Sequence, residues 1–164
     1  MAGMKWLRFA IVAYVVTILQ TAFIPIVFPA AIRPNVMVVA AGYYLLVVPR
    51  ADSLVAALII GALGDLTSIC PLGSQIIGFA VFAAVVRFVR PMLFTEQPTA
   101  HAFTVAVGYL ILNLFYRLVT LVAHDAMPLP YGFAVTVMQA ASTAVFAAVV
   151  CKLAIRRPRV SRGM

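Results

Sequence analysis

The feature that most constrains this chain is the length of its uncharged runs. No charged residue lies between Arg8 and Arg33, and between Ser53 and Val86 only Asp65 is charged. An α-helix needs about 20 apolar residues to cross the ~30 Å hydrocarbon core of a bilayer. Since 65% of the residues are hydrophobic and only 10% are charged, the composition excludes an ordinary soluble domain, in which roughly 25% are charged. We therefore predict an all-α, polytopic membrane protein.

Breaks rich in proline, glycine or charge divide the chain into six apolar segments, because these residues end helices or form turns. The first segment exceeds the ~7–15-residue apolar core of a signal peptide, so we expect it to remain as a span. The second is short, and by length alone it could be re-entrant. With 164 residues there is no room for a further domain, so we predict a single domain over 1–164. The predicted spans are 9–28, 35–48, 53–69, 73–86, 99–122 and 132–154, followed by a basic tail at 155–164.

The distribution of Lys and Arg predicts how the spans are oriented. Short loops that carry these residues stay on the cytoplasmic side of the membrane. With six spans and a cytoplasmic N-terminus, all but two of the 12 Lys and Arg residues are cytoplasmic: Arg33 lies outside and Arg117 lies within a span. We therefore predict that both termini are cytoplasmic. We interpret the net charge of +8 as a topology signal and a surface for anionic lipids, and not as a nucleic-acid-binding site.

Motifs for catalysis or metal binding are missing from the sequence. It contains no phosphate-binding loop of the form G-x-x-x-x-G-K, and no His or Cys pair has the spacing of a zinc site. No nucleophile is placed beside a base. We therefore predict no catalytic residue, no metal site and no cofactor, and we do not expect an enzyme.

Two charged residues lie at membrane depth, Asp65 in the third predicted span and Arg117 in the fifth. Charges there are costly unless they are paired, and both lie about one helical turn from the outer end. We therefore predict that they form a pair in the outer half of the membrane. If so, Asp65→Asn should lower the yield of folded protein more than an exchange of the two charges.

Uncharged polar side chains fall in the same half of the membrane. Tyr109, Asn113 and Arg117 recur every four residues and so share one helix face. The resulting cluster could only fix helix packing, or it could serve partner docking, a conformational switch or ligand binding. We expect the pair to be surrounded by Gln20, Gln75, Asn113, Thr120 and Gln139.

A stripe of small residues runs beside Asp65 in the third predicted span. Ala57, Gly61, Gly64 and Ser68 fall on one side of the helix at about 100° per residue. Small residues allow the backbones of two membrane helices to approach closely. The stripe therefore predicts a closely packed neighbouring helix.

Two motifs resemble those of the MreD family of bacterial rod-shape-determining membrane proteins. Residues 61–73 read GALGDLTSICPLG and resemble the family signature G-x-x-x-D-L-x-S-x-x-P-L-G, and Arg33-Pro34-Asn35 resembles the family's R-P-D. Length, six spans and basic cytoplasmic ends are also similar. Asn35 replaces the usual Asp, and Ile69-Cys70 stands where small residues are common. The signature positions are Arg33, Pro34, Asp65, Pro71, Leu72 and Gly73.

The resemblance implies a non-enzymatic scaffold of the cell-elongation complex in the bacterial inner membrane. Such a protein binds the single-span protein MreC and helps to connect MreB filaments to the peptidoglycan synthases, RodA and a class B penicillin-binding protein. The resemblance leaves a homodimer open. Because short or kinked spans can be relieved by association, we expect the first two spans to be interface candidates.

The resemblance also raises an alternative function. MreD-like proteins are similar in fold to the substrate-binding components of energy-coupling-factor vitamin transporters, and an outer polar cluster would suit a solute pocket. Against this, the first span contains Ala10 and Ala13 without the A-x-x-x-A pattern that such components present to their coupling subunit. We therefore prefer the scaffold.

Overall fold

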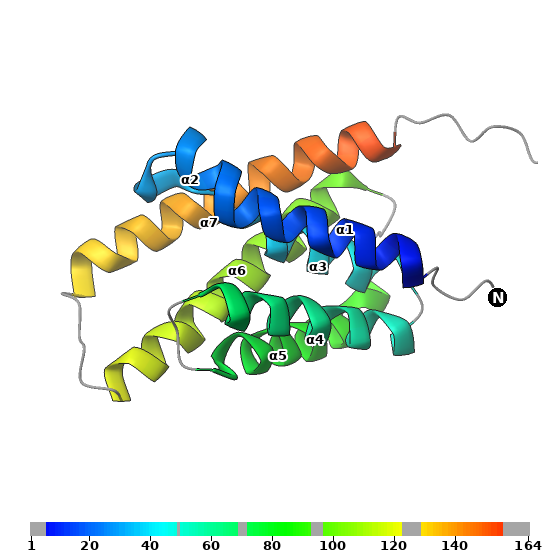
Figure 1. The fold of residues 1–164 in the computed structure, drawn as a ribbon, viewed down its shortest axis with the longest axis horizontal. Coiled ribbons are helices and arrows are strands. Elements are labelled where there is room, and N and C mark those ends of the chain that lie inside the picture. The colour runs from blue at the N-terminus through cyan, green and yellow to red at the C-terminus, as the bar shows by residue number, and fades with distance from the viewer. Residues whose placement is uncertain (1–5, 49, 69–71, 93–96, 123–128, 156–164) are drawn as a thin grey trace, which may run out of the picture.

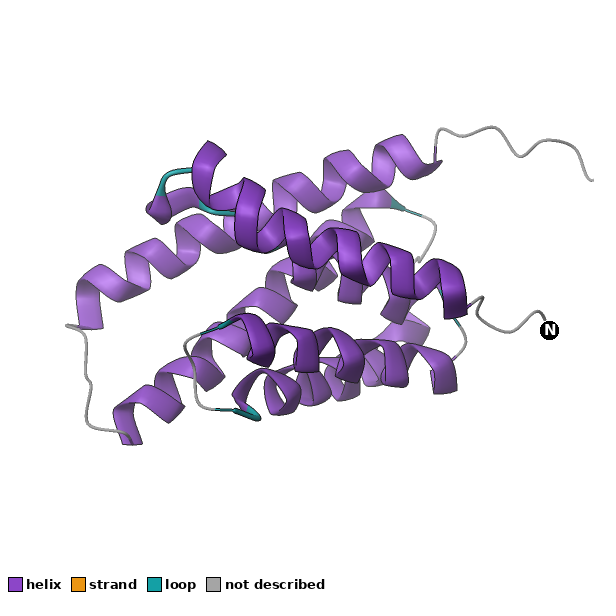
Figure 2. Cartoon of the chain, viewed as in Figure 1, coloured by secondary structure: helices purple, strands orange, loops and turns teal. Residues whose placement is uncertain are grey.

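The computed structural model describes residues 6–48, 50–68, 72–92, 97–122 and 129–155, and this part of the chain is helical with no β-strand (Figure 2). The predicted all-α class is therefore confirmed for it, and each of the six predicted segments corresponds to a helical stretch. The main helices are α1 (Trp6–Ile18), α2 (Ile24–Val27), α3 (Val36–Val47), α4 (Arg50–Thr67), α5 (Ser74–Val89), α6 (Pro98–Val122) and α7 (Leu129–Ile155). Two 3₁₀ turns, Ala30–Ile32 and Arg90–Met92, and a π-helical turn, Leu19–Phe23, complete them.

Four helical stretches are long and apolar enough to cross a membrane: Trp6–Val27, Ala30–Val47, Thr99–Leu118 and Phe133–Lys152. The helix Ser74–Val89 is apolar but shorter. The remaining helix, α4, carries three charged residues within its 18 positions. The count of six spans thus stays a prediction, as does the cytoplasmic placement of the termini.

The first span is kinked where α1 passes into α2. Pro25 has no amide hydrogen, and its ring crowds the preceding turn, so the regular hydrogen-bond pattern cannot continue through it. The chain adopts a π-helical turn instead, closed by the Ile24 amide donating to the Leu19 carbonyl oxygen. Within this stretch the Thr17 and Thr21 hydroxyls donate to carbonyl oxygens four residues earlier, which keeps both hydroxyls satisfied at membrane depth.

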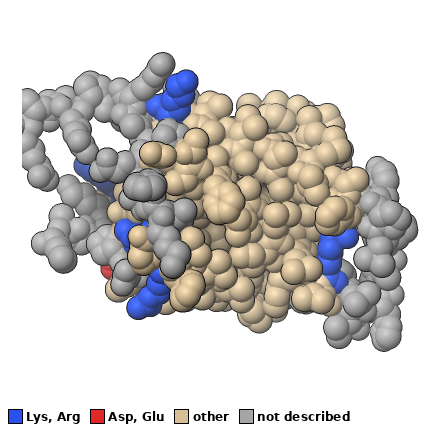
Figure 3. Space-filling model, turned by 180° about the vertical axis from the view of Figure 1, so that it is seen from behind, with Lys and Arg blue, Asp and Glu red and all other residues tan. Residues whose placement is uncertain are grey.

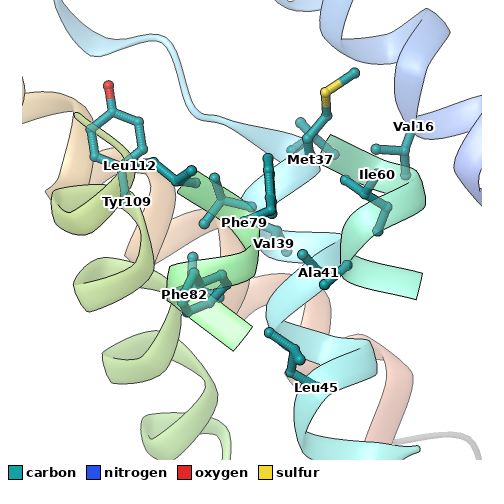
Figure 4. Packing of buried hydrophobic residues seen from close by; sticks show 14 of the residues in the cluster. Val16, Met37, Val39, Ala41, Leu45, Ile60, Phe79, Phe82, Tyr109 and Leu112 are labelled. Carbon is teal, nitrogen blue, oxygen red and sulfur yellow. The ribbon is translucent and has the colours of Figure 1, made fainter. Parts of the chain in front are cut away.

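Helix α3 lies at the centre of the molecule and packs against α1, α4, α5, α6 and α7. Figure 4 shows its side chains between those of α4, α5 and α6, with Phe79 and Phe82 of α5 filling the space beside it. Val38 and Ala41 have no exposed surface. The second span is thus largely enclosed by the protein, with Tyr43 and Val47 still exposed, and the expectation that it is an interface candidate stays a prediction.

The chain runs up and down, so the starts of α1, α4 and α6 and the ends of α3, α5 and α7 share one end of the molecule (Figure 1). We call this the cation-rich end, and the other the far end. Figure 3 shows Lys and Arg at both ends and an uncharged band between them. At the cation-rich end the described helices carry Arg8, Arg50, Arg87, Arg90 and Lys152, whereas Arg33 and Arg117 belong to the far end.

The first prediction concerns membrane orientation. In a variant without the native cysteines, Ala51→Cys places an exposed thiol at the cation-rich end, and Leu72→Cys places one at the far end, where Leu72 is 82% exposed. We expect a membrane-impermeant maleimide added to intact spheroplasts to label only Leu72→Cys, since positive residues stay inside. Labelling of both positions from the same side would contradict the predicted topology.

The second prediction concerns the small residues of α4. A Cβ at Gly61 would lie 3.0 Å from the Ile76 Cα and 3.2 Å from the Gln75 carbonyl oxygen, both backbone atoms of α5. We expect Gly61→Leu to lower the stability by about 1–3 kcal/mol, because overpacking forces backbones apart, as measured by thermal unfolding of the purified protein in detergent. Ala141→Leu, at an exposed position of α7, is the matched control, and equal melting temperatures of the two variants would contradict the contact.

Candidate functional site

Asp65 lies near the end of α4, and its carboxylate caps the start of α5. Its two oxygens accept hydrogen bonds from the backbone amides of Gly73, Gln75 and Ile76 at 3.0, 2.8 and 3.2 Å, and from the Ser74 hydroxyl at 3.5 Å. The first amides of a helix have no partner within the helix and carry its positive dipole end. A carboxylate that is only 4% exposed is thereby satisfied without a cation.

The turn before α5 brings the two helices into this geometry. Gly73 is the N-cap residue with a φ of +95°, a left-handed conformation that favours glycine. Gly64 and Gly61, about one turn and two turns before the end of α4, lie against Gln75 and Ile76 of α5. The close approach expected of the small-residue stripe is thus made to α5 of the same molecule. The other two members of the stripe are fully buried Ala57 and partly buried Ser68.

The predicted pair of Asp65 with Arg117 is corrected by these contacts. The Arg117 guanidinium donates to the Asn113 side-chain oxygen at 3.0 Å and to the Thr136 hydroxyl at 2.8 Å, whereas the contacts of Asp65 come from the start of α5. The physical reason is that a tight turn delivers backbone amides to Asp65 only eight to eleven residues along the chain. Equal depth in the membrane does not make two side chains neighbours.

A second polar network joins α6 to α7. The Thr136 hydroxyl donates to Asn113 at 2.9 Å, the Asn113 amide donates to the Tyr109 hydroxyl at 3.4 Å, and Tyr109 donates to the Gln139 side-chain oxygen. Tyr109 and Thr136 are buried, and Figure 4 shows the Tyr109 hydroxyl directed away from the apolar core. The polar face predicted on the fifth span thus binds α7.

The network continues to the motif Arg33-Pro34-Asn35. The Gln139 amide donates to the Ala30 carbonyl oxygen at 2.7 Å. The Thr143 hydroxyl donates to the Gln139 carbonyl oxygen at 2.6 Å and accepts from the Asn35 amide at 3.0 Å. These bonds connect α7 to the segment before α3. They therefore join the N-terminal and C-terminal halves of the chain through polar groups.

The residues of this motif cap helix ends on both sides. The Arg33 Nε and Nη2 atoms donate to the carbonyl oxygens of Phe28 and Pro25 at the end of α2, at 3.2 and 3.4 Å. The Asn35 side chain accepts from the Val38 amide at 3.2 Å. Buried Pro34 lies between them. Asn35 therefore serves as an N-cap, a role for which asparagine and aspartate are about equally suited.

Of the predicted polar residues, Gln20 reaches the same helix start. Gln20 lies in the π-helical turn of the first span. Its side-chain oxygen accepts a hydrogen bond from the Val36 backbone amide at 2.7 Å. Gln75 contributes its backbone amide to Asp65, while the Cβ and Cγ of its side chain lie against Gly64. The Thr120 side chain and Pro71 lie outside the described residues. The structure therefore divides the expected single cluster into an Asp65 cap and an α6–α7 network that continues to α3.

One participant, Thr143, was missed from the sequence as a cluster member. Thr143 is fully buried and joins α7 to the Asn35 backbone amide. A hydroxyl in an apolar helix often bonds its own backbone, so a lone threonine gives little signal of a tertiary contact. The spacing of Thr136, Gln139 and Thr143, at intervals of three and four, would have indicated a shared polar face.

The chemistry of these networks is that of helix capping and helix association. Among the described residues, no group of three His, Cys, Asp or Glu side chains lies close enough to hold a metal ion. The polar groups bond to one another and to backbone atoms at helix ends. Together with the apolar exposed helices, this geometry defines a helical membrane protein whose internal polar residues hold its helices together.

The chain belongs to the family of the rod shape-determining protein MreD, whose sequence pattern it matches over residues 2–154. The suspected resemblance is thereby confirmed, and it implies a role in rod shape determination. No curated protein and no solved structure matches the chain significantly. The family gives no support to the alternative of a vitamin-transporter component, and the expected likeness to that transporter fold stays a prediction.

The third prediction tests the Asp65 cap. Asp65→Ala removes the acceptor for three backbone amides. Because each amide that is buried without a partner costs ~1–3 kcal/mol, we expect the free energy of unfolding to fall by about 3 kcal/mol or more. Exchanging the charges, by Asp65→Arg with Arg117→Asp, should be at least as damaging, because an arginine cannot accept a hydrogen bond. The measurement is the yield of monodisperse protein in size-exclusion chromatography.

Arg117→Gln is the comparison variant for this experiment, because its amide can still donate to Asn113 or Thr136 and its loss of stability should be smaller. A charge-exchanged protein that is recovered better than Asp65→Ala and Asp65→Asn would restore the ion pair and overturn the cap.

Proposed function

We propose that this chain is a non-enzymatic scaffold of the cell-elongation complex in the bacterial inner membrane. In this role it binds MreC and, through it, links MreB filaments to RodA and a class B penicillin-binding protein during peptidoglycan synthesis. The observation that carries the proposal is the family match over residues 2–154. More basic residues at the cation-rich end than at the far end, and an uncharged band between the two ends (Figure 3), fit a multi-pass protein of that membrane.

The use made of the intramembrane polar residues supports a scaffold. Polar groups at membrane depth commonly mark a solute or ion pathway. Here the Asp65 carboxylate is occupied by the start of α5. Asn113 is bound by Thr136 of α7, and Gln139 is bound by Tyr109 of α6. These polar residues therefore stabilise the helix bundle and are not left open to a solute. This favours a protein that binds partners through its outer faces.

The first span offers the face best suited to a single-span partner. Of the four candidate membrane spans, Trp6–Val27 is the least buried, at 17%. Phe9, Ala13 and Val16 face the core, while large apolar side chains at the helical spacing of four, three and four point outward. This outer face of α1 consists of Leu7, Ile11, Tyr14 and Ile18, which are 76, 56, 68 and 45% exposed.

A transmembrane helix of MreC could pack along this face through van der Waals contacts, which drive helix association in lipid. The expectation that the first span is an interface candidate is consistent with its exposure. A homodimer would use another surface in this proposal, such as the exposed face of α7 around Val145 and Val149.

The fourth prediction tests this function and its docking face separately. A photo-crosslinking amino acid is placed at Tyr14 on the outer face of α1, or at Val145 on α7 as a control of similar exposure, since these side chains are 68 and 65% exposed. Each variant is co-expressed with a tagged MreC encoded in the same genome. We expect co-purification in both cases and crosslinking to MreC only from position 14.

Absence of MreC from the purified protein would contradict the scaffold function. Co-purification with crosslinks only from position 145 would leave the function standing and place the docking face on α7.

A further inference from the structure

A hollow at the cation-rich end is used neither by the capping networks nor by the proposed docking face. It has a volume of about 140 Å³ and lies where α3, α4 and α5 meet. A single water needs only ~10–15 Å³ by a comparable measure, so the space is large enough for a polar group of several atoms. It is separated from the Asp65 cap by most of the length of α5.

The walls of the hollow are mostly apolar, and its other lining residues are buried Ser53 of α4 and two arginines. Leu45, Ala83 and Leu54 line it from α3, α5 and α4, together with Ala84, which is exposed on the outer surface of α5. Arg87 and Arg90 complete the same lining, three residues apart and therefore on one side of the chain. An apolar surface next to two guanidinium groups complements a lipid, which carries a phosphate beside its hydrocarbon tail.

Arg90 is held in place by the fold. Its Nη1 atom donates to the Val48 carbonyl oxygen at 2.9 Å, at the end of α3. A guanidinium has five N–H donors in a fixed plane, and this bond to the backbone anchors one of them at the end of α3. Arginine matches phosphate through paired, charge-assisted hydrogen bonds, so a fixed arginine beside exposed Arg87 is suited to bind one phosphate.

We propose that this hollow binds an anionic phospholipid of the adjacent leaflet, with the lipid phosphate between Arg87 and Arg90 and a tail along Leu54 and Ala84. The two cations also oppose the negative dipole at the end of α5, but that role requires neither the hollow nor its apolar wall. Lipid binding at this position requires only that the chain is inserted in a membrane, and it is independent of binding to MreC.

The fifth prediction is tested by native mass spectrometry of the full chain in detergent, with phosphatidylglycerol or zwitterionic phosphatidylcholine added. We expect the protein to bind phosphatidylglycerol in preference to phosphatidylcholine. Arg87→Gln should weaken that binding roughly fivefold, the factor that corresponds to ~1 kcal/mol per cation near an anionic lipid. Ala84→Trp fills the hollow without changing the charge and should weaken binding by a similar factor.

Arg8→Gln is the matched control, because Arg8 is an exposed cation of α1 at the same end of the molecule but does not line the hollow. The Arg8→Gln variant should bind phosphatidylglycerol as tightly as the unaltered protein does. Three results would overturn the proposal: equal binding of the two lipids, equal weakening by Arg8→Gln and Arg87→Gln, or competition by inorganic phosphate at millimolar concentration, which would assign the site to a free anion.

Discussion

Unpaired backbone groups at helix ends are the constraint on which this structure depends. In a soluble protein, water can satisfy the first amides and the last carbonyls of a helix, but in hydrocarbon only the protein can do so. Helix α3 has 12 residues, which corresponds to about 18 Å and is shorter than the ~30 Å hydrocarbon core. Its ends therefore fall inside the fold, where side chains of other segments bind them.

The family motifs acquire a physical meaning from this constraint. Arg33 and Asn35 close one helix and open the next within three residues, and Asp65, near the end of α4, binds the start of α5 together with the Gly73 turn. Both motifs join an outgoing helix to a returning one at the far end. The Asp65 carboxylate serves three backbone amides at once, which offsets the cost of a buried charge in an apolar chain.

The sequence allowed the helices and part of the candidate site to be predicted. Uncharged runs located every helical segment, and the repeat of Tyr109, Asn113 and Arg117 correctly indicated a polar face. The partner of Asp65 could not be predicted, because span depth says nothing about which helices are neighbours or how they are rotated. Likewise, the burial of α3 depends on the packing of all the other helices, and local hydrophobicity does not distinguish lipid from protein as its surroundings.

The bond between the Asn35 amide and the Thr143 hydroxyl spans 108 residues of sequence, and this separation has a consequence for biosynthesis. The central helix is translated early, yet one of the groups that completes its beginning is on α7, which leaves the ribosome after the other described helices. Until that helix is inserted, the early spans hold an unfinished core. Assembly of the bundle is thus tied to the insertion of α7, and a chain terminated before Thr143 lacks the hydroxyl that binds the start of the central helix.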